Sequence, residues 1–153
     1  MQDSVSFVIP VLNEQATAAD LLRDLRQRYP LSQLIVVDGG SRDRTVALAL
    51  PLCDLVLLST RGRANQMNMG GQVASSEYLF FLHADSRPSI SAAQLHAYIA
   101  KRPRWGFCRV HLSGPQAMFR VIEWFMNQRS RLTSVATGDQ MLFVQKSLFD
   151  ETG

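Results

Sequence analysis

Short runs of apolar residues, rich in valine, isoleucine and leucine, alternate along this chain with segments of helical periodicity. The runs are 4–12, 33–37, 54–59 and 78–82. The intervening segments that we predict as helices are 17–28, 42–50 and 64–75. A strand followed each time by a helix is typical of a parallel sheet, and near-continuous apolar runs indicate strands buried on both faces. The sequence therefore predicts an α/β fold with a mostly parallel central sheet flanked by helices.

The remainder of the chain continues the same pattern. We predict a helix at 91–101, a strand at 105–112, a helix at 116–131 and a final strand at 141–145. No internal repeat, low-complexity segment or linker interrupts the 153 residues, of which 46% are hydrophobic and 19% charged. A chain of this length and composition buries a core without disulfides or a structural metal. We therefore expect one domain, residues 1–153.

The composition disfavours several classes of protein. No apolar run reaches the ~18 residues of a membrane span, and residues 1–4 lack the basic region of a signal peptide. Cys53 and Cys108 lie far apart and outside any metal-ligand pattern, which favours reduced thiols and a cytoplasmic location. The net charge of +3 suits phosphate-rich ligands or an anionic membrane face, although a few extra surface arginines explain it equally well. Scattered basic residues without a recognition motif argue against nucleic-acid binding.

Polar and charged residues follow the predicted strands at their carboxyl ends. They are Asn13, Glu14, Asp38, Arg61, Arg63, His83 and Asp85. In parallel α/β sheets these ends meet at one edge, and ligands bind there. The sequence therefore predicts a site at this edge, although connecting loops are commonly polar for other reasons.

Two well-known nucleotide-binding patterns are missing from this edge. A dinucleotide-binding domain needs a glycine-rich turn after its first strand, whereas 10–14 contains no glycine, and no P-loop is present. A phosphatase of the haloacid dehalogenase type would carry a second aspartate two residues after Asp38, where Gly40 stands.

The loop that follows the third predicted strand is basic. The guanidinium groups of Arg61 and Arg63 match the oxygens of a diphosphate and stay charged. Asn65 adds amide donors at the start of the next helix, or caps that helix. The alternative is a solvated basic loop without a ligand.

Three segments carry a resemblance to a known family. They are Phe7-Val-Ile-Pro-Val-Leu-Asn-Glu14, Ile35-Val-Val-Asp-Gly-Gly-Ser-Arg-Asp-Arg-Thr45 and Phe81-Leu-His-Ala-Asp85. In this order and at this spacing they resemble the signatures of family 2 glycosyltransferases. The segments 62–71 and 138–140 are further similar to a bacterial branch whose acceptors are poorly defined. The resemblance covers essentially the whole chain and implies the Rossmann-like GT-A fold of nucleotide-diphospho-sugar transferases.

The resemblance implies transfer of a sugar from a nucleotide-sugar donor, with inversion at the anomeric carbon. It assigns to the nucleotide site Pro10, Val11, Asn13, Glu14, Asp38, Gly39, Gly40, Arg61, Arg63, Asn65, His83 and Ala84. Asp38 would accept the imide N–H of uracil, which favours a UDP-sugar, or it caps the following turn. Glu14 either lines the nucleoside pocket or is a first-turn acid stabilised by the helix dipole. Glycines 39 and 40 allow a sharp turn that brings backbone N–H groups to the ligand, whereas Asp43 and Thr45 are expected to organise that turn.

Asp85 occupies the metal-binding position of the family signature. A departing diphosphate needs a hard cation with oxygen ligands, here Mg²⁺ or Mn²⁺. The first acid of the Asp-x-Asp signature is replaced by His83, which would contact the ribose, ligate a softer ion such as Mn²⁺, or be a simple loop histidine.

Asp139 is the candidate base within these residues, or a residue that lines the site. In related sequences a later Glu-Asp pair supplies the base, whereas this chain ends at Gly153. We therefore expect the nucleotide-sugar-binding part of a GT-A domain that is incomplete at its C-terminus or completed by another chain. It would bind nucleotide and transfer sugar poorly by itself. The alternatives are a catalytically incompetent nucleotide-binding module and a sugar nucleotidyltransferase.

The segment 118–131 is rich in aromatic residues and methionine, with Arg120, Arg129 and Arg131 nearby. A basic amphipathic helix of this kind lies on a membrane surface in some proteins, which would suit the inner face of the membrane and a lipid-linked acceptor. The alternative, which we favour, is a helix that packs on the sheet or on a partner in a homo-oligomer.

Overall fold

The computed structural model describes residues 4–112 and 140–152 of the chain. The elements are β1 (Val5–Val11), α1 (Ala18–Arg28), β2 (Gln33–Asp38), α2 (Thr45–Ala49), the 3-10 helix η1 (Leu50–Leu52), β3 (Leu55–Leu58), α3 (Arg63–Val73), β4 (Tyr78–Phe81), β5 (Ser86–Pro88), α4 (Ala92–Ile99), β6 (Trp105–Leu112), β7 (Gln140–Gln145) and α6 (Lys146–Thr152). The predicted helix at 116–131 and Asp139 lie outside the described residues.

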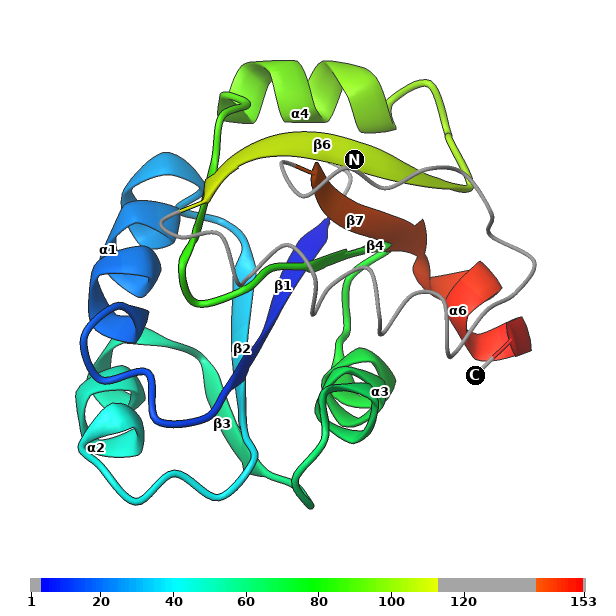
Figure 1. Ribbon diagram of the computed structural model, residues 1–153. Coiled ribbons are helices and arrows are strands. Elements are labelled where there is room, and N and C mark those ends of the chain that lie inside the picture. Colours follow the sequence, from blue (N-terminus) through cyan, green and yellow to red (C-terminus); the bar gives the residue numbers. More distant parts are fainter. Residues whose placement is uncertain (1–3, 113–139, 153) are drawn as a thin grey trace.

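The strands form one sheet in the order β3-β2-β1-β4-β7-β6-β5 (Figure 1). The first four are parallel neighbours, and β7, β6 and β5 join them through antiparallel pairs. In the β1–β2 register, Val11 lies beside Asp38. The two strands therefore end together, as the alternating pattern predicts, and the α/β fold is confirmed.

Helices cover both faces of this sheet, because successive side chains of a strand point to opposite sides. Phe7 of β1 packs in one core cluster with residues of α1 and α4, such as Leu22 and Leu95. Its neighbour Val8 belongs to the other cluster, with Met67 of α3 and Phe149 of α6. Burial on both faces explains why the strands read as near-continuous apolar runs. No helix within the described residues is long and apolar enough to cross a membrane.

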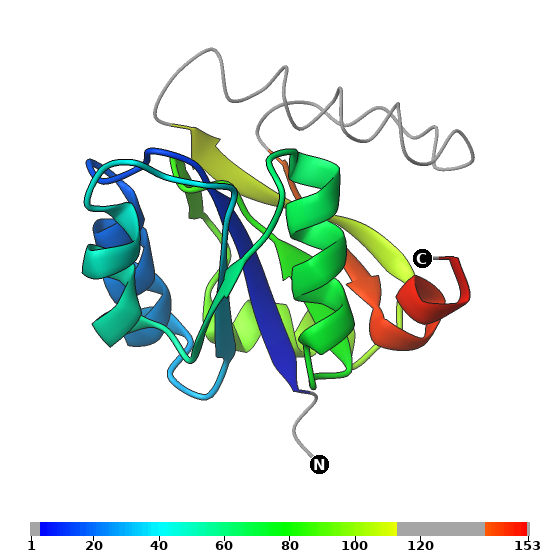
Figure 2. The same cartoon turned by 90° about the horizontal axis from the view of Figure 1, so that it is seen from below.

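Helix α3 packs closely on the sheet and on α6 through two glycines (Figure 2). A methyl group added at Gly70 would lie 2.3 Å from Cγ1 of Val8, and one at Gly71 would lie 2.4 Å from the ring of Phe149. A larger residue at Gly70 would therefore push the helix away from β1, and one at Gly71 would push it away from α6. This close approach fixes the height of α3 above the carboxyl ends of the strands.

Three elements differ from the sequence prediction, and one of them is helix α6, which was not predicted. The predicted helix 42–50 begins only at Thr45, because the N–H groups of Arg42 and Arg44 donate to side chains of the loop after β1 instead. The predicted loop 83–88 contains the short strand β5, which pairs with β6. A three-residue strand that ends in proline gives almost no periodic signal.

Candidate functional site

Asp38 ends β2 with its side chain buried at 2% residue exposure. Its Oδ2 accepts hydrogen bonds from the N–H groups of Gly40 (3.0 Å) and Ser41 (2.9 Å). Its Oδ1 is also buried and has no hydrogen-bond partner within the described part of the chain. Asp38 thus caps the turn with one oxygen, as the structural alternative predicts, and keeps the other as an unused acceptor. A buried acceptor without a partner costs free energy unless a ligand or water fills it.

The loops that follow β1 and β2 are joined by side chains. Asn13, at a positive φ of 53°, accepts from the N–H of Arg42 through Oδ1, and its own N–H donates to Oγ of Ser41. The N–H of Glu14 donates to Oγ1 of Thr45 at 2.8 Å. These bonds connect segments 28 to 31 residues apart. They explain why the two motifs occur together, and they hold the rim beside Asp38 in one shape.

Asp43 adds to these bonds between the loops after β1 and β2, which together we call the loop clamp. Its Oδ1 accepts from the N–H of Thr45 at 2.9 Å, and its Oδ2 accepts from the N–H of Gln15 at 3.3 Å. The hydrogen bond from the Thr45 hydroxyl lowers the pKa of Asp43 despite an opposing effect of desolvation. Asp43 and Thr45 therefore organise the turn, as the sequence predicts.

The backbone N–H groups of the glycine turn at 39–41 donate to acceptors within the protein. The N–H of Gly39 donates to the carbonyl of Val11 at 3.0 Å, and those of Gly40 and Ser41 donate to Asp38. These N–H groups are therefore engaged within the protein, and the place of Gly39 and Gly40 in the nucleotide site stays a prediction. Gly40 adopts a φ of 100°, which a residue with a Cβ rarely adopts.

An open cavity of about 210 Å³ lies between the end of β1 and the start of α3. Its lining consists of Pro10, Val11, Leu12, Glu14, Arg61, Gly62, Arg63 and Gln66. Five of the predicted nucleotide residues are thus brought together here, and Leu12, Gly62 and Gln66 are additions. The cavity combines an apolar wall with two guanidinium groups, as a ligand with a flat ring and an anionic group requires.

The other predicted residues are not among those that line this cavity. Asn13 is in the loop clamp, and Ala84 is fully buried after β4. Asn65 is exposed, and its Nδ2 donates to the carbonyl of Arg61 at 3.5 Å, so its side chain does not accept from the helix N–H groups as a cap would.

His83 and Asp85 form a contact pair directly after β4. Nδ1 of His83 lies 2.7 Å from Oδ1 of Asp85, and their side chains are 3% and 22% exposed. Nε2 of His83 is buried and has no hydrogen-bond partner among the residues described. The pair therefore orients the carboxyl group of Asp85 and leaves one imidazole nitrogen with unused bonding capacity.

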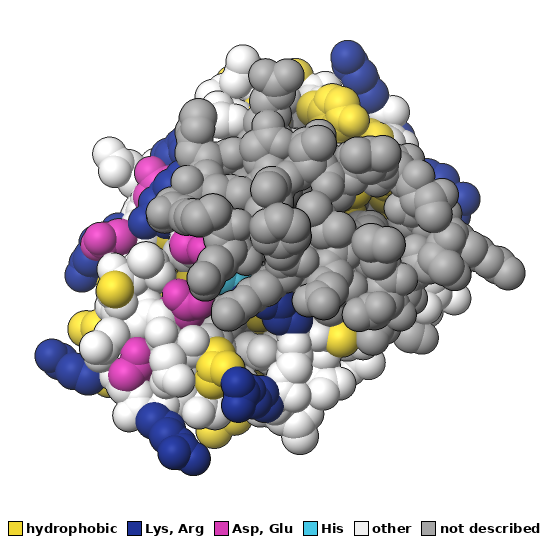
Figure 3. All heavy atoms as spheres, viewed as in Figure 1, with side chains coloured by type: hydrophobic (Ala, Val, Ile, Leu, Met, Phe, Trp, Pro, Cys, Tyr) yellow, Lys and Arg dark blue, Asp and Glu magenta, His cyan; other side chains and the backbone are white. Residues whose placement is uncertain are grey.

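The charges around Asp85 keep it ionised. Burial alone raises the pKa of its carboxyl group, but the contact with His83 and the positive charge of Arg63 outweigh burial, and the pKa is lowered. The influence of Arg63 also connects the start of α3 electrostatically with the end of β4. Figure 3 shows acidic, basic and histidine side chains near one another on one face of the molecule. The described residues contain no cluster of three or more His, Cys, Asp or Glu side chains that could hold a metal by themselves.

Gln66 is the buried polar residue among the three cavity residues that the sequence prediction missed. It is 3% exposed, and its Nε2 donates to the carbonyls of Val11 and Val37, each at 2.8 Å. A polar residue one turn before Gly70, on the face that packs on the sheet, is the signal that could have found it.

The comparisons with known proteins agree with this geometry. The sequence model of glycosyl transferase family 2 matches residues 6–145. The chain belongs to glycosyl transferase family 2. The match includes β1, β2, β4 and the residues at their carboxyl ends.

Among its relatives is poly-beta-1,6-N-acetyl-D-glucosamine synthase of Staphylococcus epidermidis, 32% identical over 93 residues. The enzyme of the same name from Staphylococcus aureus is 30% identical over 91 residues. Each match covers 55% of this chain and 22% of the relative, so this family 2 chain corresponds to about a fifth of those proteins.

Solved structures show the same fold at low identity. The mannosyltransferase PcManGT of Pyrobaculum calidifontis, in complex with GDP-Man and Mn²⁺, superposes with a TM-score of 0.70 at 19% identity, over 97% of this chain and 46% of its own. TarS of S. aureus superposes with a TM-score of 0.69 at 18% identity, over 97% and 48%. Glucosyl-3-phosphoglycerate synthase of Mycobacterium tuberculosis, with Mn²⁺ and UDP-glucose, superposes with a TM-score of 0.62 at 18% identity, over 95% of this chain and 57% of its own. The fold of this chain is therefore the GT-A fold of these glycosyltransferases.

Proposed function

We propose that this chain binds the donor of a sugar-transfer reaction, a nucleotide-sugar with UDP favoured, at the carboxyl edge of β2, β1 and β4. The observation that carries the proposal is the unused buried acceptor Oδ1 of Asp38, which suits the imide N–H of uracil. The cavity beside it supplies an apolar wall and the guanidinium groups of Arg61 and Arg63 for a diphosphate. Family membership and the solved relatives with UDP-glucose and GDP-Man support a nucleotide-sugar as the ligand.

The residues fit a divalent cation that is shared with the ligand. Asp85 is ionised and partly exposed, and its carboxyl group would supply the protein ligand. His83 contacts that carboxyl group through Nδ1 and would orient it, while Nε2 on the far side of the ring keeps its bonding capacity. One or two protein ligands, completed by phosphate oxygens and water, suit Mg²⁺ or Mn²⁺ in nucleotide sites. When bound, such a cation neutralises the charge that develops on the departing diphosphate.

The chain's own residues would orient the donor. Asp38 holds the base, and the clamp of Asn13 with the turn after β2 keeps that carboxyl group at a fixed height. The arginines at the start of α3 add positive charge on the diphosphate side, where charge grows as the sugar leaves. Attack by an acceptor hydroxyl from the opposite side would invert the anomeric carbon. The candidate base Asp139 lies outside the described residues, and we keep it as a proposal.

The remaining expectations extend this proposal. The proposed site of action is the cytoplasm, where nucleotide-sugars are available, or the inner face of the membrane if the acceptor is lipid-linked. A homo-oligomer or a second chain would complete the acceptor half of the site.

Calorimetric titration with UDP and GDP, with and without Mn²⁺, tests the proposal. We expect Mn²⁺-dependent binding of UDP, with a loss of about 100-fold in Asp85→Asn because a charged ligand of the cation is gone. Asp20→Asn, on the exposed face of α1, is the matched control and should bind like the unaltered chain. Failure of the unaltered chain to bind either nucleotide would contradict the proposal.

A further inference from the structure

Gln66 connects the three elements around the cavity. It lies on α3, one turn after the arginines, and its side-chain amide donates to carbonyls near the ends of two neighbouring strands, Val11 of β1 and Val37 of β2. Both hydrogens of the amide are used, and the side chain is buried. A glutamine in this position joins the helix to both strands at the height of the cavity.

The surrounding glycines make this contact possible. Gly70 follows Gln66 by four residues, and a Cβ there would lie 2.3 Å from Val8, so the helix approaches the sheet closely only because this atom is missing. Gly39 gives the amide its space, since a Cβ there would lie 2.9 Å from Cδ and Oε1 of Gln66. The sequence thus supplies two small residues around one buried polar group.

The two strand ends and the helix carry different parts of the candidate site. Val11 precedes the loop with Glu14, and Val37 precedes Asp38 at the end of β2; we place Glu14 and Asp38 on the nucleoside side. Arg61, Gly62 and Arg63 lead into α3 and face the same cavity. We propose that Gln66 is a positioning residue, which sets the distance between the nucleoside pocket and the diphosphate-binding arginines. This inference rests on the proposed function and adds a residue to that site.

A positioning role differs measurably from a structural one. A variant that only lowers the fraction of protein competent to bind weakens the binding of every ligand by the same factor. Misplacement of the arginines relative to the nucleoside pocket instead weakens the binding of UDP and leaves the binding of uridine nearly unchanged. The ratio of the uridine and UDP dissociation constants therefore reports the positioning role alone.

The experiment compares Gln66→Met with the unaltered chain by titration with uridine and with UDP in the presence of Mn²⁺. Methionine has a similar length and cannot donate to the two carbonyls. Gln72→Met, at an exposed position of the same helix, is the matched control. We expect the ratio to fall about tenfold in Gln66→Met, within the usual range of coupling between sites, and to stay unchanged in Gln72→Met.

An unchanged ratio in folded Gln66→Met, with UDP still bound by the unaltered chain, would overturn the inference and leave the proposed function standing. Binding of neither UDP nor GDP by the unaltered chain would overturn both. If the unaltered chain prefers GDP, guanosine and GDP replace the uridine pair.

If Gln66→Met does not fold, the unaltered chain still gives an answer by NMR. We expect the side-chain amide protons of Gln66 to exchange with solvent far more slowly than those of Gln72, and to shift with UDP but not with uridine. Equally fast exchange at both glutamines, or equal shifts with the two ligands, would overturn the inference.

Discussion

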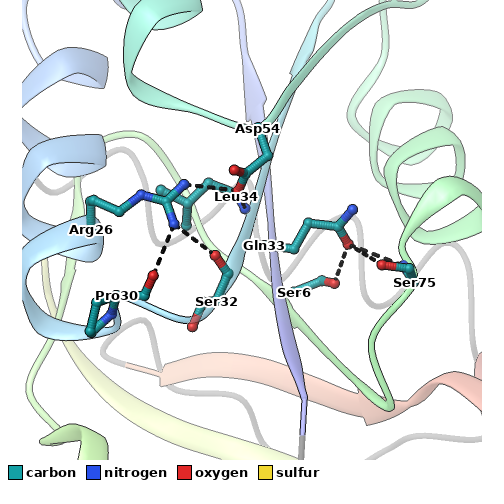
Figure 4. Close-up of polar contacts among 8 residues, drawn as sticks. All are labelled: Ser6, Arg26, Pro30, Ser32, Gln33, Leu34, Asp54 and Ser75. Carbon is teal, nitrogen blue, oxygen red and sulfur yellow. Dashed lines mark hydrogen bonds and ion pairs between the residues drawn. The ribbon is translucent and has the colours of Figure 1, made fainter.

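The two edges of the same parallel sheet treat their polar groups differently. At the amino edge, Oε1 of Gln33 accepts from the hydroxyl of Ser6 (2.6 Å) and from both N–H and hydroxyl of Ser75 (3.0 and 3.2 Å) (Figure 4). Asp54 likewise accepts from the N–H of Leu34 and from Arg26. At the carboxyl edge, Asp38 and His83 each keep a buried polar atom without a partner among the described residues.

This difference shows what each edge does. Polar groups at the amino edge hydrogen-bond to one another and stabilise the fold. Those at the carboxyl edge are held in position by similar bonds but retain bonding capacity, which is the condition for binding a ligand. Substitution of the shared acceptor Gln33 at the amino edge should therefore change stability, and substitution of the partly bonded Asp38 at the carboxyl edge should change binding.

The largest effect is expected where α3 spans both edges. Gly70→Ala places a methyl group against Val8 and Val37, and overpacking of this kind costs about 3 kcal/mol. Both the free energy of unfolding and UDP binding should suffer, because the helix carries Gln66 and the arginines. Urea unfolding and calorimetry measure the two effects, with Gln72→Ala as the control. A fully stable Gly70→Ala would show that α3 does not lie this close to β1.

Asp38→Asn should separate binding from stability. The amide oxygen of asparagine can still accept from Gly40 and Ser41, while the unused carboxyl oxygen becomes an N–H donor that opposes the imide N–H of uracil. We expect UDP affinity to fall by about 2 kcal/mol with little change in melting temperature. Calorimetry and thermal unfolding check this, and undiminished UDP affinity would remove Asp38 from the nucleoside pocket.

Gln33→Met is the corresponding test at the amino edge. It leaves the buried hydroxyl of Ser6 and the groups of Ser75 without their shared acceptor, which should cost about 2 kcal/mol of stability. UDP affinity measured below the unfolding transition should stay the same. A selective loss of UDP binding would mean that the two edges are not independent.

The smallest effect is expected from the pH dependence of Asp43. Its pKa is lower in the folded chain than in the unfolded chain, so its contribution to stability is present above the unfolded pKa and disappears as the pH falls through the folded pKa. Asp43→Asn should therefore be slightly less stable than the unaltered chain at neutral pH, and the gap should narrow in acid. Urea unfolding at a series of pH values measures it, and a gap that widens in acid would contradict the assignment.

The sequence predicts the positions of β1 to β4 well, because buried parallel strands give long apolar runs between polar ends. It also predicts which edge carries Asp38, Arg61 and Asp85. It does not predict that Gln66 is buried, since an amide on a helix ordinarily faces water. Nor does it predict that Arg42 stays outside α2, because that depends on a bond to Asn13, 29 residues earlier.

The central claim is that the nucleotide binds at the carboxyl edge and leaves the amino edge untouched. The most direct measurement is an NMR titration of the backbone amides with UDP and Mg²⁺, a diamagnetic ion that avoids the signal loss caused by Mn²⁺. We predict the largest shifts at 12–14, 38–41, 61–66 and 83–85, and none at Ser6, Gln33 and Ser75. Shifts concentrated at the amino edge, or no shift at any of these positions, would contradict the account.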